Sequence, residues 1–225
     1  MPDNMIYQIA VWLVPLVIAI VFHEVAHGWT ALALGDPTAK ERRRLSLNPI
    51  RHVDPFGTLI LPGLLALAGA PVFGWAKPVP VDYRRLRNPR RDMVLVALAG
   101  PGMNLLLALI GAAILAATIS LSGGAHDGVS RLVAANALNF MLINIFLGVF
   151  NLLPVPPFDG GHVLQGLLPP SAAAAVGRIG RYSLLVLIVL LLVLPQFGID
   201  IIGRIVSPIV GVLMRLFLGV FGLVG

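Results

Sequence analysis

Residues 6–34 read IYQIAVWLVPLVIAIVFHEVAHGWTALAL, an apolar stretch in which His23, Glu24 and His27 are the only imidazole or carboxyl side chains. The stretch is longer than the roughly 20 apolar residues that a helix needs to cross a bilayer. The chain continues with further apolar stretches at 56–73, 93–120, 132–153, 182–194 and 199–220. The sequence therefore predicts an all-α polytopic membrane protein with about five transmembrane helices plus a re-entrant or short apolar segment.

The distribution of basic residues predicts how these spans are oriented. Lys and Arg gather mainly in two clusters, at 40–51 and 77–91, and the positive-inside rule places both on the cytoplasmic side. The stretch 56–73 lies between them, so we expect it to enter and leave the membrane by the same face. Its Pro62 suits a bent or re-entrant segment, because irregular backbone at membrane depth is tolerated against protein or a wet cavity. The N-terminus then lies outside.

Composition narrows the chemistry that the chain can perform. The sequence is 58% hydrophobic and only 12% charged, which is typical of a membrane protein rather than of a soluble domain. We interpret the net charge of +6 as a signal of orientation in the lipid bilayer, not of nucleic-acid binding. Cysteine is absent, so a metal site must use histidines and carboxylates. We expect a single membrane-embedded domain, 1–225, with its core at about 6–168 and additional C-terminal spans at about 178–222.

The motif His23-Glu24-Val25-Ala26-His27 predicts a metal site within the first span. Residues four apart share one face of a helix, so both imidazoles can reach one ion, and the intervening Glu24 is typical of a general base. Ionisable side chains at membrane depth are costly unless they pair or bind an ion, which favours the metal interpretation over two unrelated histidines. The motif lies roughly 14 Å from the cytoplasmic boundary of the span. We expect the site to receive water from that face.

A third ligand is expected from the proline-rich stretch 151–162, NLLPVPPFDGGH. Its prolines interrupt the preceding helix, and Asp159 is a lone acid in a long apolar region that a bound cation would satisfy. Two histidines and one carboxylate leave a fourth position for water, as in a catalytic zinc site. His162 is a rival ligand, and the alternative for Asp159 is a helix N-cap. Weaker candidates are His52 and His126.

The segment Trp75–Val81 is predicted to be an extended strand or loop near this site. Pro78 and Pro80 lack N–H groups on one edge, while Lys77, Val79 and Val81 keep theirs on the other. One hypothesis is that this edge pairs with a substrate strand. The alternative is a plain interfacial loop anchored by tryptophan.

Asparagines recur on one face of the span 132–153. They predict either a polar groove for substrate or hydrogen bonds between helices, and the groove is favoured for Asn151 alone. Asn104, in a neighbouring span, is expected to help close helix packing. The four asparagines of this face are Asn136, Asn139, Asn144 and Asn151.

Three motifs together resemble the site-2 protease family of intramembrane metallopeptidases. They are HEVAH at 23–27, Ala99-Gly100-Pro101 in a later span, and Asn151-x-x-Pro154-x-Pro156-x-x-Asp159-Gly160. The resemblance covers roughly His23 to His162. It implies one zinc ion per chain bound by His23, His27 and Asp159, with Glu24 as the base and Asn151 as a contact to substrate near the metal.

The resemblance also implies an activity. We expect a zinc metalloendopeptidase that cuts transmembrane or signal-peptide-like substrates during regulated intramembrane proteolysis, in the cytoplasmic membrane of a prokaryote. Its compact length leads us to expect neither a PDZ domain nor a nucleotide-sensing module. The alternatives are a membrane metal transporter and a metal-binding scaffold without proteolysis. A transporter typically carries polar residues on several helices through the full membrane depth, and this sequence lacks that pattern.

Overall fold

The computed structural model describes residues 5–67, 69, 74–122 and 128–223, and the observations below concern this part of the chain. The chain forms two compact units. The first unit contains residues 1–19, 101–153 and 200–225, and the second contains residues 20–100 and 154–199. Helices α1 (Met5–Ala33) and α4 (Pro89–Ser122) each contribute residues to both units.

The predicted number of membrane-spanning helices is confirmed. Four helical segments are long and apolar enough to cross a bilayer: α1, α4, α5 (Gly128–Asn151) and the segment Gly203–Val220. The last of these contains α9 (Ser207–Val220), which follows a π-helical turn at Ile202–Val206. A bent pair of helices brings the total to five if it counts as one span. No strand occurs in the described residues, so the prediction of an all-α membrane protein holds.

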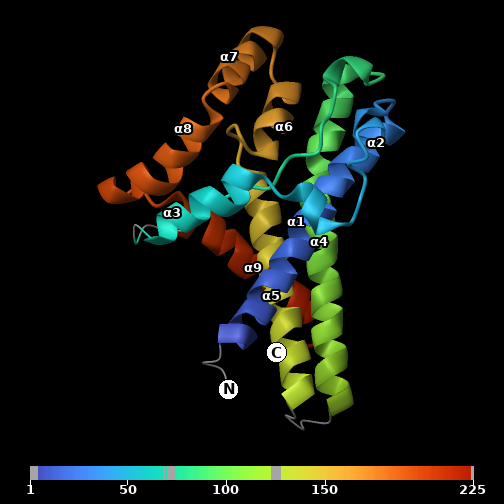
Figure 1. Cartoon of the computed structure of the whole chain (residues 1–225), viewed down its shortest axis with the longest axis vertical. Coiled ribbons are helices and arrows are strands. Elements are labelled where there is room, and N and C mark those ends of the chain that lie inside the picture. The colour runs from blue at the N-terminus through green and yellow to red at the C-terminus, as the bar shows by residue number, and fades with distance from the viewer. Residues whose placement is uncertain (1–4, 68, 70–73, 123–127, 224–225) are drawn as a thin grey trace. The chain divides into compact units, whose positions relative to one another are not determined.

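The bent pair contains the apolar stretch 182–194, which the sequence predicts as a span. It consists of α7 (Pro170–Gly180) and the helical run Ser183–Phe197, which begins with α8 (Ser183–Ile188); both helices are labelled in Figure 1. The two parts meet at 77°. This apolar stretch alone is shorter than the roughly 20 residues that a span requires. The chain adds the preceding helix, which begins with proline at its first position, where the missing N–H costs nothing.

Packing in the first unit depends on small residues. Gly111 of α4 lies so close to α5 that an added Cβ would be 3.2 Å from the carbonyl oxygen of Ala137 and from the backbone nitrogen of Met141. Such close backbone approach is typical of helices packed in membranes. The core that forms there, where α5 and α9 also contact one another, consists of Ala108, Ala112, Met141, Ile145, Val149, Val206 and Val210.

Asparagines tie the helices of the first unit together. Asn104 donates from Nδ2 to the Oδ1 of Asn144 over 2.8 Å, and both side chains are fully buried. Asn139 donates to the carbonyl oxygen of Val11 over 2.9 Å. These bonds satisfy polar groups within the apolar bundle. The packing role predicted for Asn104 is confirmed, and the helix-to-helix interpretation holds for Asn139 and Asn144.

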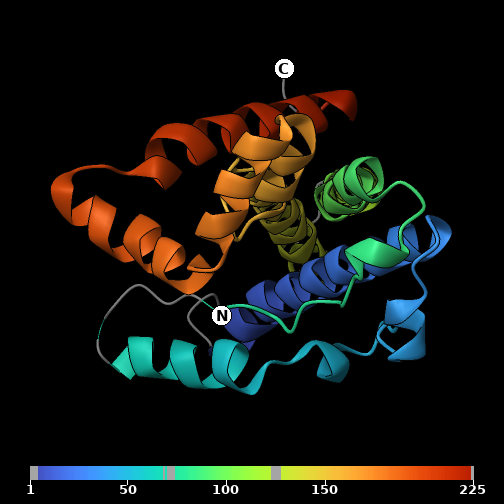
Figure 2. The same cartoon turned by 90° about the horizontal axis from the view of Figure 1, so that it is seen from above.

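The second unit contains the shorter elements, which follow α1. They are α2 (Thr38–Glu41), a 3-10 turn at Pro49–His52, a π-helical turn at Pro55–Ile60, α3 (Leu61–Leu67), a 3-10 turn at Tyr83–Arg85, α6 (Asp159–Leu167), α7 and α8, with further turns at Val189–Val193 and Leu194–Phe197. Figure 2 shows α3 continuing from the turn before it as one short helical segment.

This short helical segment corresponds to the apolar stretch predicted at 56–73, of which residues 68 and 70–73 lie outside the described part. Asp54 caps its start, accepting hydrogen bonds from the backbone nitrogens of Phe56 (3.1 Å) and Gly57 (2.6 Å). The cap satisfies N–H groups that have no partner within the helix. Residues 75–81, predicted as a strand or loop, form an extended loop without a partner strand among the described residues.

Candidate metal centre

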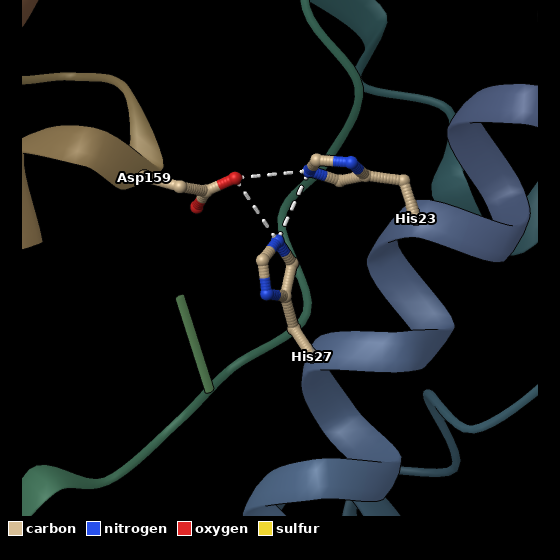
Figure 3. A group of neighbouring side chains, drawn as sticks. All are labelled: His23, His27 and Asp159. Atoms are coloured by element: carbon tan, nitrogen blue, oxygen red, sulfur yellow. Dashed lines mark hydrogen bonds and ion pairs between the residues drawn. The ribbon is translucent and has the colours of Figure 1, made fainter. Parts of the chain in front are cut away.

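The centre begins with the two histidines of the first helix. His23 and His27 lie one turn apart on α1, both buried, and their Nε2 atoms are 3.0 Å apart (Figure 3). The rings are nearly perpendicular, with an interplanar angle of 86°. Helical spacing therefore brings two imidazole nitrogens to one point, as the sequence predicted.

A backbone carbonyl of α4 fixes the tautomer of one imidazole. The Nδ1 of His27 donates to the carbonyl oxygen of Val96 over 2.7 Å. In a neutral imidazole the proton on Nδ1 leaves the lone pair on Nε2, the atom that faces His23 and Asp159. Metal-binding histidines typically use one ring nitrogen for the ion and give the other to such an acceptor. This bond thus directs the Nε2 lone pair of His27 toward His23 and Asp159, as the predicted ligand role requires.

The third member is Asp159, the first residue of α6. Its Oδ2 lies 3.2 Å from the Nε2 of His23 and 3.4 Å from the Nε2 of His27 (Figure 3). The atom is buried, and no other described group bonds to it. A carboxylate at the start of a helix also faces the positive end of the helix dipole. The N-cap position belongs to Phe158, so Asp159 does not act as the predicted alternative cap.

The three donor atoms fit a tetrahedral zinc ion. Zinc holds histidine nitrogen and carboxylate oxygen at about 2.0–2.2 Å, which places the ligand atoms of a tetrahedron roughly 3.4 Å from one another. The separations here are 3.0, 3.2 and 3.4 Å. Two lone pairs and a carboxylate this close together repel each other unless a cation or a proton lies between them. The arrangement therefore has the donor chemistry and the spacing of a zinc site with one position left for water.

Gly100 of α4 makes room for the two imidazoles. A Cβ at this position would lie 2.4 Å from the Nε2 of His27 and 2.6 Å from the Cε1 of His23. Real Cβ atoms do not approach other atoms this closely, so no other residue fits here without moving the two imidazoles. The sequence identified Gly100 only as part of a family motif, and its physical role becomes clear from the structure.

Arg90 of α4 holds the far end of the helix that carries Asp159. Its Nε donates to the carbonyl oxygen of Gly166 over 2.8 Å, and its Nη2 donates to that of Leu168. These carbonyls end α6 and have no partners within the helix. Gly166 also packs directly against Val94: a Cβ added to Gly166 would lie 2.1 Å from the Cγ2 of Val94. Sequence analysis assigned Arg90 only to a basic cluster and missed this clamp.

Glu24 lies on α1 and directly follows His23 in the sequence. Its Oε2 accepts a hydrogen bond of 2.7 Å from the backbone nitrogen of Val79, in the extended loop. The side chain is half-buried. One carboxylate oxygen is therefore held by the protein, and the charge of the group sits beside the predicted metal ligands.

The remaining predicted residues are distributed as follows. Lys77 donates from its backbone nitrogen to the carbonyl oxygen of His52, and both Lys77 and Val79 thus have N–H partners inside the chain. Val81 follows in the same loop. Asn151 ends α5 in the first unit, where its Nδ2 donates to the carbonyl oxygen of Leu147 over 3.0 Å. Contacts of these residues with substrate stay predictions.

The rival histidines do not join the cluster. In the described part of the chain, the histidine and acidic side chains with ligand atoms all within 4.8 Å of one another are His23, His27 and Asp159. His162 is exposed on α6. His52 is buried elsewhere, with its Nε2 donating to the carbonyl oxygen of Ser46 over 2.7 Å. His126 lies outside the described residues.

An apolar helical bundle with two histidines, one carboxylate and an adjacent glutamate defines a membrane zinc metallopeptidase. The profile described as Peptidase family M50 matches residues 119–194. The chain is 39% identical over 181 residues to "Putative zinc metalloprotease YwhC" of Bacillus subtilis, covering 79% of this chain and 78% of that protein. The chain belongs to peptidase family M50, the site-2 protease family. It is an integral membrane protein and a zinc metalloendopeptidase, as its sequence predicted.

Mycobacterial relatives support the same assignment. The chain is 35% identical over 185 residues to "Putative zinc metalloprotease Rip2" of Mycobacterium tuberculosis, covering 82% of this chain and 66% of that protein. It is 32% identical over 188 residues to the protein of the same name from Mycolicibacterium smegmatis, covering 83% of this chain and 67% of the relative. No solved structure matches the chain. Family membership favours the peptidase over the transporter and scaffold alternatives.

Proposed function

We propose that this metalloendopeptidase cuts peptide bonds within the membrane, in transmembrane or signal-peptide-like substrates, as a step of regulated intramembrane proteolysis. The observation that carries the proposal is the location of the centre. His23 and His27 lie inside a helix that is long and apolar enough to span a bilayer, and Asp159 meets them there. A peptidase whose ligands lie within a span acts on bonds that reach that depth.

The predicted zinc ligands and Glu24 have different roles in peptide hydrolysis. Zinc, when bound by His23, His27 and Asp159, supplies a Lewis acid that lowers the pKa of water and polarises a carbonyl. Glu24 accepts a proton from the attacking water and passes it to the leaving amine. The Glu24 carboxylate thus acts first as a general base toward water and then as a general acid toward the leaving amine.

The substrate must unwind before it is cut. Amides within a transmembrane helix are already hydrogen-bonded to one another, so the carbonyl at the cleavage site has to be released first. Helix-breaking residues near the cut lower the cost of that step. We therefore expect substrates with glycine or proline near the cleaved bond to be hydrolysed faster.

The predicted topology is part of this function. The active site lies nearer the cytoplasmic face, with the N-terminus outside, in the cytoplasmic membrane of a prokaryote. Residues 1–225 act as one peptidase domain. Asn151 contacts the substrate. Substrate pairing at Lys77, Val79 and Val81, the alternative role of that edge, would require exchange of the N–H bonds that Lys77 and Val79 make inside the chain.

A cleavage assay in nanodiscs tests the proposal. The purified protein is offered two matched peptides with the same cleavable sequence, one placed inside a transmembrane segment and the other in a soluble polar peptide. We expect cleavage of the transmembrane peptide, mapped by mass spectrometry to its apolar segment, and none with Glu24→Gln. Cleavage restricted to the soluble peptide would refute intramembrane action while leaving zinc-dependent proteolysis intact.

A further inference from the structure

The extended loop beside the centre is held along one edge by groups of the protein itself. The backbone nitrogen of Trp75 donates to the carbonyl oxygen of Gly57 over 3.1 Å, and the hydroxyl of Thr58 donates to the carbonyl oxygen of Trp75 over 2.8 Å. Two residues on, the backbone nitrogen of Lys77 donates to the carbonyl oxygen of His52 over 2.8 Å. The edge therefore behaves like a strand whose partners are separate carbonyls and side chains.

Arg44 supplies the next contact on this edge. Its Nη2 donates to the carbonyl oxygen of Lys77 over 2.7 Å, so both backbone groups of Lys77 are engaged. Two residues further, the backbone nitrogen of Val79 donates to the Oε2 of Glu24 over 2.7 Å. Alternate residues of an extended chain point their backbone groups to the same side, so fixing Lys77 also fixes the direction of the Val79 N–H.

Close packing brings the loop to the helix that carries Glu24. Val79 is buried, and its Cγ1 would lie 2.8 Å from a Cβ added to Gly28 of α1. Gly28 therefore leaves the space that Val79 occupies. The charge of Glu24 also acts on Arg44: burial lowers the pKa of Arg44, and Glu24 counteracts that shift. The guanidinium is thus within electrostatic range of the base.

We propose that Arg44 is a positioning residue, which sets the orientation of the Glu24 carboxylate through Lys77 and the N–H of Val79. The inference rests on the proposed function, because Glu24 matters as the base of peptide hydrolysis. With Oε2 fixed by a charge-assisted hydrogen bond, Oε1 is the oxygen left to receive a proton from water. A carboxylate free to rotate would spend much of its time in unproductive orientations, and misplacement of a reacting group costs rate rather than affinity.

The positioning role and the substrate-pairing role of this edge make different predictions. If the Val79 N–H holds Glu24 during catalysis, weakening the loop lowers kcat and leaves KM nearly unchanged. If the same edge instead binds the substrate strand, weakening it raises KM. Steady-state kinetics with a transmembrane peptide in nanodiscs therefore separates the two roles.

The experiment compares the full-length zinc-loaded protein with Arg44→Ala, Arg44→Lys and the control Arg42→Ala. Arg42 is an exposed arginine of the same basic cluster. We expect Arg44→Ala to lower kcat by about tenfold to a hundredfold with zinc content unchanged. Arg44→Lys should recover most of the loss, because one donor to the carbonyl oxygen of Lys77 is enough. Arg42→Ala should match the wild type.

Hydrogen exchange supplies a readout independent of activity. Pro78 and Pro80 have no amide hydrogen, so Val79 is an isolated amide whose exchange can be assigned. We expect exchange at Val79 to rise by about tenfold or more in Arg44→Ala and also in Glu24→Ala, while Lys77 stays protected in the latter. Unchanged exchange at Val79 in both variants would overturn the proposal, as would an effect of Arg44→Ala on KM alone. Failure of the proposed function appears differently, as absence of cleavage of the transmembrane peptide by the wild type, and the exchange at Val79 can still be measured in that case.

Discussion

Replacement of Gly100 by alanine is the substitution whose effect the structure defines most sharply. The added Cβ would lie 2.4 and 2.5 Å from the Nε2 and Cε1 of His27, whereas ordinary contacts begin near 3.5 Å. The ring must therefore move by about 1 Å, while zinc sites tolerate ligand displacements of about 0.2 Å. We expect zinc affinity to fall by at least about a hundredfold, equivalent to roughly 2.7 kcal/mol.

The assay is competition with a chelator of known zinc affinity, measured on purified protein alongside proteolysis. Gly102→Ala is the matched control, because no described atom lies within 4 Å of a Cβ added there on the same helix. Alanine favours a helix over glycine by about 1 kcal/mol, so a loss of zinc cannot come from a weaker helix. Equal zinc affinity in the two variants would refute the steric role of Gly100.

Three further predictions concern Glu24, Arg90 and Asp36. Glu24→Gln should retain one zinc per chain yet lose peptidase activity by about a hundredfold or more, and retained activity would remove Glu24 as the base. Arg90→Ala should weaken zinc binding by about tenfold, because the helix that carries Asp159 loses the hydrogen bonds at its C-terminal end. Replacement of the exposed Arg91 by alanine should leave zinc binding unchanged. Equal zinc titrations of the two variants would contradict this role of Arg90. Burial raises the pKa of Asp36, but hydrogen bonds from Thr38 and from the backbone nitrogen of Asp82 outweigh this and lower the pKa overall. The Asp36 carboxylate therefore stabilises the fold above its unfolded-state pKa, and this stabilisation is lost as pH falls through its lower folded-state pKa. Asp36→Asn should destabilise the protein by about 1–3 kcal/mol near pH 7 and by less in acid, as measured by thermal unfolding. A difference in stability that does not change with pH would contradict this role of Asp36.

Much of the metal centre follows from the sequence because its chemistry is local. His23 and His27 share a helix face by their spacing alone, and the cost of ionisable groups in an apolar span predicts a bound cation. Asp159 follows because it is a lone acid beyond a proline-rich interruption. The number of spans follows from the length and hydropathy of each stretch.

The contacts that orient these residues depend on tertiary structure. The carbonyl of Val96, which holds His27, carries no side-chain signal, since every residue has a carbonyl. The loop 75–81 is extended as its proline pattern indicates, but its partners are separate backbone and side-chain groups rather than a strand. The bend between α7 and α8 was missed because hydropathy alone does not show where two short helices join into one span.

The most direct test of the account is zinc X-ray absorption spectroscopy on the purified protein, calibrated by metal content. We predict one zinc ion per chain with two imidazole nitrogens and carboxylate oxygen at about 2.0–2.2 Å. The imidazole count should fall to one in His27→Ala. A spectrum with fewer than two imidazoles in the wild type, or one that His27→Ala leaves unchanged, would contradict the centre formed by His23, His27 and Asp159.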